Sequence, residues 1–240
     1  MTDGATYDLG IDTAADDASL ALLRGDEVVS ERAWHVDTTM SRELLAQLDA
    51  LLVEAGVTRQ QIASIAVVTG PGTYGAVRTG IATAQGLALA LDVPLAGVGR
   101  FEADAARHLD AAAPERVVVA VHEAGRSGTA WAAYTLAGST DGAPRCLVAP
   151  RLDPPDEVAR TAPAPALWCG EVTPVLVQAL QDAERASGDT YADNDAGAPA
   201  GRAVALVRIA RARQAYGDPA LVDAFYLRPP SITRAKPREA

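Results

Sequence analysis

The sequence predicts an α/β fold built from two tandem lobes, each with the order β-β-β-α-β-α and the second one reduced. Three observations support this prediction. Residues 62–98 read as a strand, a glycine-rich loop, a helix and another strand, and two strands joined in this way are parallel neighbours. Three segments with alternating apolar and polar residues precede this unit. A weaker copy of the same order follows it, so we divide the chain at 1–110 and 111–240.

The first lobe has clear start and stop signals. Arg24 to Glu27 suit the turn of a hairpin, Thr38 or Thr39 can cap a helix, and Gly56 can end it. The elements expected in this lobe are strands at 7–13, 18–23, 27–36, 62–68 and 95–98, and helices at 41–55, 75–91 and 100–109.

The loop Gly70-Pro71-Gly72 ends the central strand, because proline lacks an N–H group and glycine permits positive φ. The helix after it has small residues beside its apolar stripe, including two glycines that each cost roughly 1 kcal/mol relative to alanine. These small residues are Ala76, Gly80, Thr83, Gly86 and Ala90. Two explanations stay open: the helix packs closely on its own sheet, or a second helix from another chain approaches it. The second predicts that Gly80 faces outward and that Gly80→Arg folds but loses its partner.

The second lobe is harder to assign. The elements expected there are strands at 116–121, 130–136, 145–149 and 166–169, a proline-rich connector at 150–165 with at most a short polar helix, helices at 174–186 and 203–216, and a loop at 187–201. The last helix should direct its arginines to solvent, or to an acidic partner; they are Arg202, Arg208, Arg211 and Arg213. In the apolar tail, Tyr226 and Leu227 should lie back on the protein, with 234–240 disordered.

The composition limits the function. The formal charge is −10, which argues against an independent nucleic-acid binder, and the 49% hydrophobic content is typical of a globular chain. No apolar run reaches about 18 residues, and the first residues lack the pattern of a signal peptide, so we expect a cytoplasmic protein with no membrane contact. The two cysteines, Cys146 and Cys169, are expected to be reduced.

Two lobes of this order resemble the fold shared by actin, Hsp70 chaperones and sugar kinases. Residues 70–80 resemble the motif Gly-Pro-Gly-Ser-Phe-Thr-Gly-Leu-Arg-Ile-Gly of the TsaB (YeaZ-like) family, and residues 10–14, 123–126 and 226–233 are similar to further family segments. The sequence departs from the family pattern at several positions: Gly75-Ala76 replace Thr-Gly, Thr79 replaces Ile, Met40 replaces a common His, and Glu123 replaces Asp.

This resemblance implies a non-catalytic subunit of the bacterial machinery that makes N6-threonylcarbamoyladenosine (t6A) in tRNA. Such a subunit pairs with its catalytic paralogue TsaD, is joined by the ATPase TsaE, forms a homodimer when alone, and meets tRNA only indirectly. It has no catalytic residue, cofactor or metal of its own. Its partner interface is expected on the loop and the helix that follows, at Gly70, Pro71, Gly72, Tyr74, Ala76, Val77, Arg78, Gly80, Ile81, Thr83 and Ala84.

Two enzyme classes compete with this interpretation. Gly70 to Gly75 fit the dinucleotide pattern G-x-G-x-x-G between a strand and a helix, although three antiparallel strands precede it and Gly97 to Arg100 provide no acidic residue. An ATP-dependent transferase or kinase of the actin-like fold would hold phosphates at residues 13–18, where Asp16 and Asp17 repel them.

A metal site is poorly supported by the sequence. Asp12 could hold Mg²⁺, but a single aspartate at the end of a strand more often forms a turn. The histidines His35, His108 and His122 have no spacing typical of a zinc site.

Overall fold

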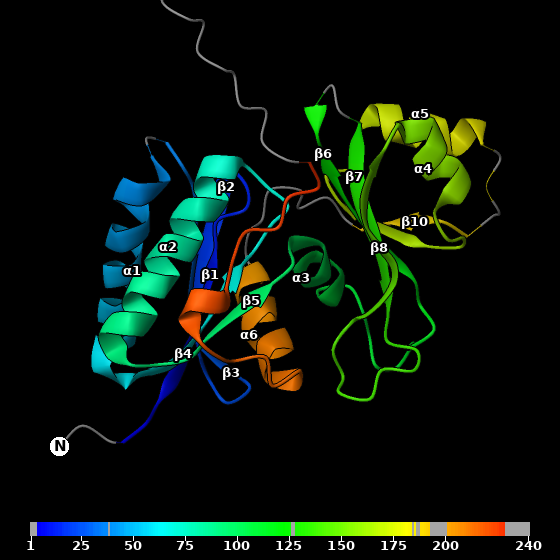
Figure 1. Cartoon of the computed structure of the whole chain (residues 1–240). Helices are drawn as coiled ribbons and strands as arrows, with labels where there is room; N and C mark the ends of the chain where they lie inside the picture. Colours follow the sequence, from blue (N-terminus) through cyan, green and yellow to red (C-terminus); the bar gives the residue numbers. More distant parts are fainter. Residues whose placement is uncertain are drawn as a thin grey trace, which may run out of the picture.

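The computed structural model describes residues 4–37, 39–125, 128–183, 185, 188–192 and 201–228 (Figure 1). The expectations for Thr38, for Arg126, and for residues 229–233 and 234–240 of the tail lie outside these residues.

The chain forms strands and helices in the predicted order. The strands are β1 (Tyr7–Asp12), β2 (Asp17–Arg24), β3 (Glu27–His35), β4 (Ile62–Val68), β5 (Leu95–Val98), β6 (Val118–Glu123), β7 (Thr129–Thr135), β8 (Arg145–Asp153), β9 (Leu167–Gly170) and β10 (Thr190–Tyr191). The helices are α1 (Met40–Ala55), α2 (Tyr74–Leu91), α3 (Arg100–Ala106), α4 (Pro155–Thr161), α5 (Pro174–Asp182) and α6 (Arg202–Ala212), with 3₁₀ turns at Arg59–Gln61 and Pro219–Leu221.

The two halves of the chain build two five-stranded sheets of matching topology. The described strands lie in the orders β3-β2-β1-β4-β5 and β8-β7-β6-β9-β10. In each sheet the first three strands are antiparallel, and the two that follow helices pair in parallel. This arrangement confirms the predicted α/β fold with two tandem lobes.

Helices cover both faces of each sheet, and two of them are exchanged between the halves (Figure 1). Helices α1 and α2 lie on the outer side of the first sheet, and α6, from the end of the chain, packs on β1, β2, β4 and β5. Helix α3, from the first half, packs on β6, β7 and β9. We use "lobe" for a sheet with the helices packed on it. The sequence boundary at residue 110 stays a prediction, because α3 and α6 each pack on the sheet of the other half.

Close contact between α6 and the first sheet depends on one glycine. A Cβ atom at Gly10 would lie 2.2 Å from the carbonyl oxygen of Ala203, so any larger residue in the middle of β1 would push α6 away. The apolar residues of α6 join those of β1, β2 and β4 in one core, while the second lobe has separate cores on the two faces of its sheet.

The structure differs from the predicted elements mainly in the second half. Strand β8 continues to Asp153 through Pro150, in a segment predicted to be a connector. Proline is tolerated there because β8 is the edge strand of its sheet. Strand β10 occupies Thr190–Tyr191, where a loop was expected, and α6 ends at Ala212 instead of Tyr216.

The prediction that the arginines of the last helix face solvent is wrong for Arg202, which is buried, and holds for Arg208 and Arg213, which are exposed. Arg211 is half-buried and bonds to the carboxylate of Asp8. Arg213, just after the helix, pairs with a buried glutamate. Carboxylates of neighbouring elements therefore hold three of the four arginines, and the spacing of α6 alone did not reveal them.

Candidate functional site

The loop before α2 packs directly against the end of β1. A Cβ atom at Gly72 would lie 2.1 Å from the carbonyl oxygen of Ala14, and the Thr73 N–H donates to that oxygen at 3.2 Å. Gly70 has φ of +105°, and a Cβ there would lie 2.9 Å from the carbonyl oxygen of Phe225. These two glycines of the G-x-G-x-x-G pattern thus allow close approach of the protein's own backbone, which is the role that a dinucleotide site gives them toward pyrophosphate.

Gly80 faces the inside of the protein. It is buried on α2, and a Cβ atom there would lie 2.1 Å from Oγ1 of Thr13 and 3.1 Å from its Cβ and Cγ2. The expectation that Gly80 faces outward is therefore wrong. This glycine lets α2 pack on the end of β1, which is the first of the two explanations offered by the sequence.

The other residues predicted for the interface divide by exposure. Tyr74 and Arg78 are exposed, and Gly72, Ala76 and Thr83 are half-buried. The remaining members are buried, and three of them, Val77, Ile81 and Ala84, belong to the core of the first lobe. The other two are Gly70 and Pro71 of the loop.

The outer face of α2 carries small and apolar residues that the sequence pattern did not single out together. We define the α2 face as the exposed residues Tyr74, Arg78, Ala82, Gly86, Leu89 and Ala90. Leu89 is 69% exposed. Helix α1 lies beside α2 (Figure 1), and on it Val53 is 80% and Leu45 50% exposed. Exposed apolar side chains on two adjacent helices are typical of a protein-binding surface.

A C-terminal strap, residues 217–228, crosses the inner edge of α2. The ring of Tyr226 stacks on Tyr74 with 5.2 Å between centroids, and its hydroxyl accepts a hydrogen bond from Nε of Arg78 at 2.9 Å. Gln85 on α2 donates to two carbonyl oxygens of the strap at 2.9 Å. Leu227 packs on the core around α3. The prediction that Tyr226 and Leu227 lie back on the protein is confirmed.

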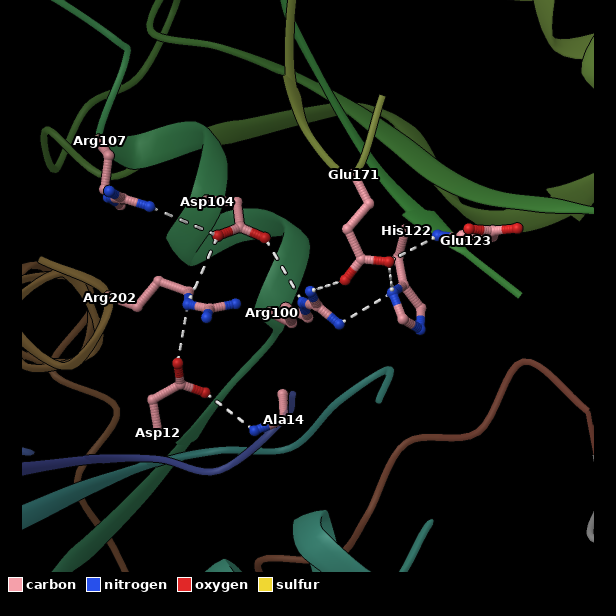
Figure 2. A network of polar contacts seen from close by, with 9 residues as sticks. All are labelled: Asp12, Ala14, Arg100, Asp104, Arg107, His122, Glu123, Glu171 and Arg202. Carbon is pink, nitrogen blue, oxygen red and sulfur yellow. Dashed lines mark hydrogen bonds and ion pairs between the residues drawn. The ribbon is translucent and has the colours of Figure 1, made fainter. Parts of the chain in front are cut away.

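A network of charged groups fills the junction between the lobes (Figure 2). At the end of β1, Asp12 is fully buried, and its Oδ2 pairs with Nε of Arg202, the first residue of α6, at 2.8 Å. The same Nε lies 3.8 Å from Oδ1 of Asp104 on α3. Arg100, one turn earlier on α3, lies 3.6 Å from the other oxygen of Asp104.

On the second sheet, the network ends at Glu171 and His122. Glu171 follows β9 and accepts a hydrogen bond from Arg100 at 2.7 Å and from the Glu123 N–H at 3.0 Å. His122 Nδ1 lies 2.8 Å from Oε2 of Glu171, the oxygen that accepts from the Glu123 N–H, and 3.0 Å from Arg100 Nη1. Burial alone would raise the pKa of Glu171, but the His122 hydrogen bond and the Arg100 charge lower that pKa to about 2.

The Nδ1 atom of His122 cannot form hydrogen bonds to both of its neighbours. A guanidinium can only donate and an ionised carboxylate can only accept, so Nδ1 either donates to Glu171 or accepts from Arg100. The tautomer of His122 decides between the two bonds.

The turn after β1 does not fit a magnesium-bound polyphosphate. The Oδ1 of Asp12 accepts from the Ala14 N–H at 3.1 Å, and its Oδ2 pairs with Arg202, so the carboxylate is already neutralised. The Ala14 carbonyl is covered by the glycine-rich loop. No group of three His, Cys, Asp or Glu side chains among the described residues is arranged to hold a metal ion.

Comparison with known proteins assigns the family. The family described as TsaD, tRNA N6-adenosine threonylcarbamoyltransferase, matches residues 36–163. Two solved structures match, YeaZ from Pseudomonas aeruginosa and a protein with similarity to peptidase YeaZ from Pseudomonas aeruginosa, at 26% and 25% identity and with TM-scores of 0.74 and 0.71. The matches cover 92% and 93% of this chain and 100% of those chains. The chain belongs to the TsaB/YeaZ family.

Curated relatives match only in part. TsaB of Bacillus subtilis is 36% identical over 42% of this chain and 45% of its own length. TsaB of Haemophilus influenzae is 32% identical over 47% of this chain and 48% of its own length. A threonylcarbamoyltransferase of Nitratidesulfovibrio vulgaris is 40% identical over 46% of this chain and 34% of its own. The chain thus spans between about a third and a half of the curated relatives it matches. Within its described residues, every helix is too short or too polar to cross a membrane.

Proposed function

We propose that this protein is a non-catalytic subunit of the t6A machinery, acting in the cytoplasm. It binds a TsaD-type paralogue through the α2 face, works with a TsaE-type ATPase, and forms a homodimer when alone. The observation that carries the proposal is the α2 face itself, where small residues lie beside the exposed Tyr74, Arg78 and Leu89.

The chemistry of the α2 face suits contact with another helix. Gly86 and Ala82 let a second backbone come close, and Leu89 offers a large apolar side chain to bury. Tyr74 and Arg78 belong to the residue types that contribute most to binding at interfaces. One face cannot serve two partners at once, so the homodimer and the heterodimer should compete for it.

The lobe junction supports the non-catalytic part of the proposal. Arg202 neutralises Asp12, which a kinase of this fold would use for magnesium, and the loop covers the turn where phosphates would lie. An ATP-dependent transferase is the alternative. We expect no heat of binding when the protein is titrated with Mg-ATP or with NAD(P). Turnover by the chain alone that disappears in a folded Asp12→Ala variant would establish the alternative.

The interface is tested by Gly86→Arg. A Cβ atom at Gly86 meets nothing within 4 Å, so the arginine fits the isolated protein, and arginine is a better helix former than glycine. In an interface it would bury an unpaired charge. We expect the variant to fold, to run as a monomer on sizing, and to lose co-purification with the TsaD-type protein.

The matched control is Gln181→Arg, which adds the same charge at an exposed position on α5 of the other lobe. It should keep both assemblies. A folded Gly86→Arg variant that still dimerises and still binds the paralogue would show that the interface does not lie on the α2 face.

A further inference from the structure

Among the described residues, two ion pairs join the lobes, and both connect an arginine at one end of α6 to a buried carboxylate of α3. Helix α6 packs on the first sheet and α3 on the second, so a bond between these helices is a bond between lobes. Arg202, the first residue of α6, lies 3.8 Å from Asp104 of α3. Arg213, which follows the last turn of α6, lies 2.6 Å from Glu102 of α3.

Both carboxylates are nearly inaccessible to water. The side chains of Asp104 and Glu102 are 6% and 9% exposed. Burial raises the pKa of Glu102, and the charge of Arg213 opposes this rise. Burying two such groups costs free energy that their ion pairs only partly return, so pairs of this kind are better explained by the geometry that they fix than by stability.

The two ion pairs are well placed to fix an angle. They lie at opposite ends of α6, so together they resist rotation of one lobe about the other, which a single pair would permit. Arg202 is also held from its own lobe, because it pairs with Asp12 of the first sheet. Arg213 makes a second bond across the junction, since its Nη2 donates at 2.7 Å to the carbonyl oxygen of Pro144, in the segment before β8 of the second sheet.

We propose that Arg202–Asp104 and Arg213–Glu102 form an interlobe lock, which holds the lobes at one angle without any ligand between them. The chain then presents its surfaces as one rigid body. The lock also reaches the loop before α2, because the Arg100 N–H, at the start of α3, donates to the Gly70 carbonyl oxygen at 2.8 Å. This inference does not depend on the identity of the partner.

The lock is tested by measuring the distance between the lobes in the full chain. Nitroxide labels are attached at Ala46→Cys on α1 and Gln181→Cys on α5, both exposed positions. Exposed Cys146 is replaced by serine, and buried Cys169 is left in place. Pulsed electron resonance should give one narrow distance distribution, unchanged by Mg-ATP.

The variant Glu102→Gln/Asp104→Asn removes both cross-lobe ion pairs and nearly preserves side-chain shape. It does not leave the guanidinium groups buried without a partner. Arg202 still pairs with Asp12, Arg100 still pairs with Glu171, and the side chain of Arg213 is 38% exposed to water. We expect a second distance population that the unmodified lock does not show. If the double variant fails to fold, Glu102→Gln alone is measured, and the same second population is expected.

The control Asp156→Asn/Glu157→Gln removes two carboxylates from α4, within one lobe, and should leave the narrow distribution unchanged. Leu176→Ala, which opens a cavity in the core of the second lobe, should lower the melting temperature and also leave the distance unchanged. A narrow distribution in the folded lock variants would overturn the proposal. A shift of the distance in the unmodified protein on adding Mg-ATP would also overturn it.

Discussion

The two lobes share one topology but close the loop between the fourth strand and its helix in different ways. In each lobe a glycine with positive φ stands three residues before the threonine at the N-cap of the helix, Gly70 before Thr73 and Gly170 before Thr173. The next residue differs. It is Pro71 in the first lobe, where the loop is buried against backbone, and Glu171 in the second, where it reaches an arginine and a histidine.

The first lobe therefore fits its loop by shape, and the second holds its loop by charge. Close packing of a loop is disrupted when a side chain is enlarged, and it does not depend on pH. A loop held by ion pairs tolerates a change of side-chain size but is weakened when its carboxylate is protonated. The following predictions test this contrast, from the largest expected effect to the smallest.

The largest effect is expected for Gly80→Arg. The new side chain would enter the contact between α2 and Thr13 and bury a charge, so we expect a loss of about 4 kcal/mol or more in the free energy of unfolding. Gly86→Arg, on the open side of the same helix, is the control and should unfold at or above the normal midpoint in urea. Similar stability of both variants would show that α2 is not packed by shape.

Removal of the strap should have the next largest effect, since the first lobe packs this segment on α2. Truncation after Ala224 removes the Tyr226 stack, the hydrogen bond to Arg78 and the packing of Leu227. We expect the free energy of unfolding to fall by about 3 kcal/mol, which will be measured as a lower melting temperature. Truncation after Arg228 keeps these contacts and serves as the control. An unchanged melting temperature after truncation at Ala224 would mean that the strap does not stabilise the fold.

Acid should weaken the second lobe through Glu171. Its pKa is about 2 in the folded protein and 4.5 for an ordinary glutamate, as in the unfolded chain, so its contribution is present above pH 4.5 and is lost as the pH falls toward 2. We expect this contribution to be about 1–2 kcal/mol, because a third of the side chain is exposed and water screens the charge. Urea unfolding from pH 6 to pH 3 measures it. Glu171→Gln should remove this part of the pH dependence, and an unchanged slope would argue against it.

The smallest effect separates the two helix caps. The Thr173 hydroxyl oxygen accepts a hydrogen bond from the Leu176 N–H at 3.2 Å, whereas Thr73 makes no side-chain cap bond to α2. Thr173→Ala should lower the free energy of unfolding by about 1 kcal/mol, and Thr73→Ala by only about a few tenths of a kcal/mol. Chemical unfolding of the two variants makes the comparison. Equal losses would mean that α2 and α5 begin in the same way despite the different loops.

The sequence predicted the fold well because its signals are local. Apolar periodicity placed β4 and α2, and Gly56 was expected to end α1, which it does with φ of +64°. Contacts between distant segments left no such local signal. The burial of Gly80 depends on Thr13, far away along the chain, so helical spacing alone could not decide which side of α2 it occupies.

The charged junction was missed for the same reason. Arg202 was read as one of several arginines on a polar face, because nothing near it in the sequence indicates Asp12. Arg100 and Glu171 are also distant in the sequence and meet only after α3 packs on the second sheet. A buried arginine and an exposed one look alike in a single sequence, and the strap was placed correctly only because its side chains are too apolar for a free end.

The exchange of α3 and α6 has a consequence for synthesis of the chain. When β5 (Leu95–Val98) leaves the ribosome, the face of the first sheet around Gly10 has no cover, because α6 (Arg202–Ala212) is made much later. At a rate of protein synthesis of about 5–20 residues per second, this face stays uncovered for on the order of ten seconds before α6 is made. The first half therefore cannot complete its core as it emerges, and α3 has no sheet to pack on until β6 and β7 follow. A gene split between the halves would yield two fragments that each lack a helix and that fold only together.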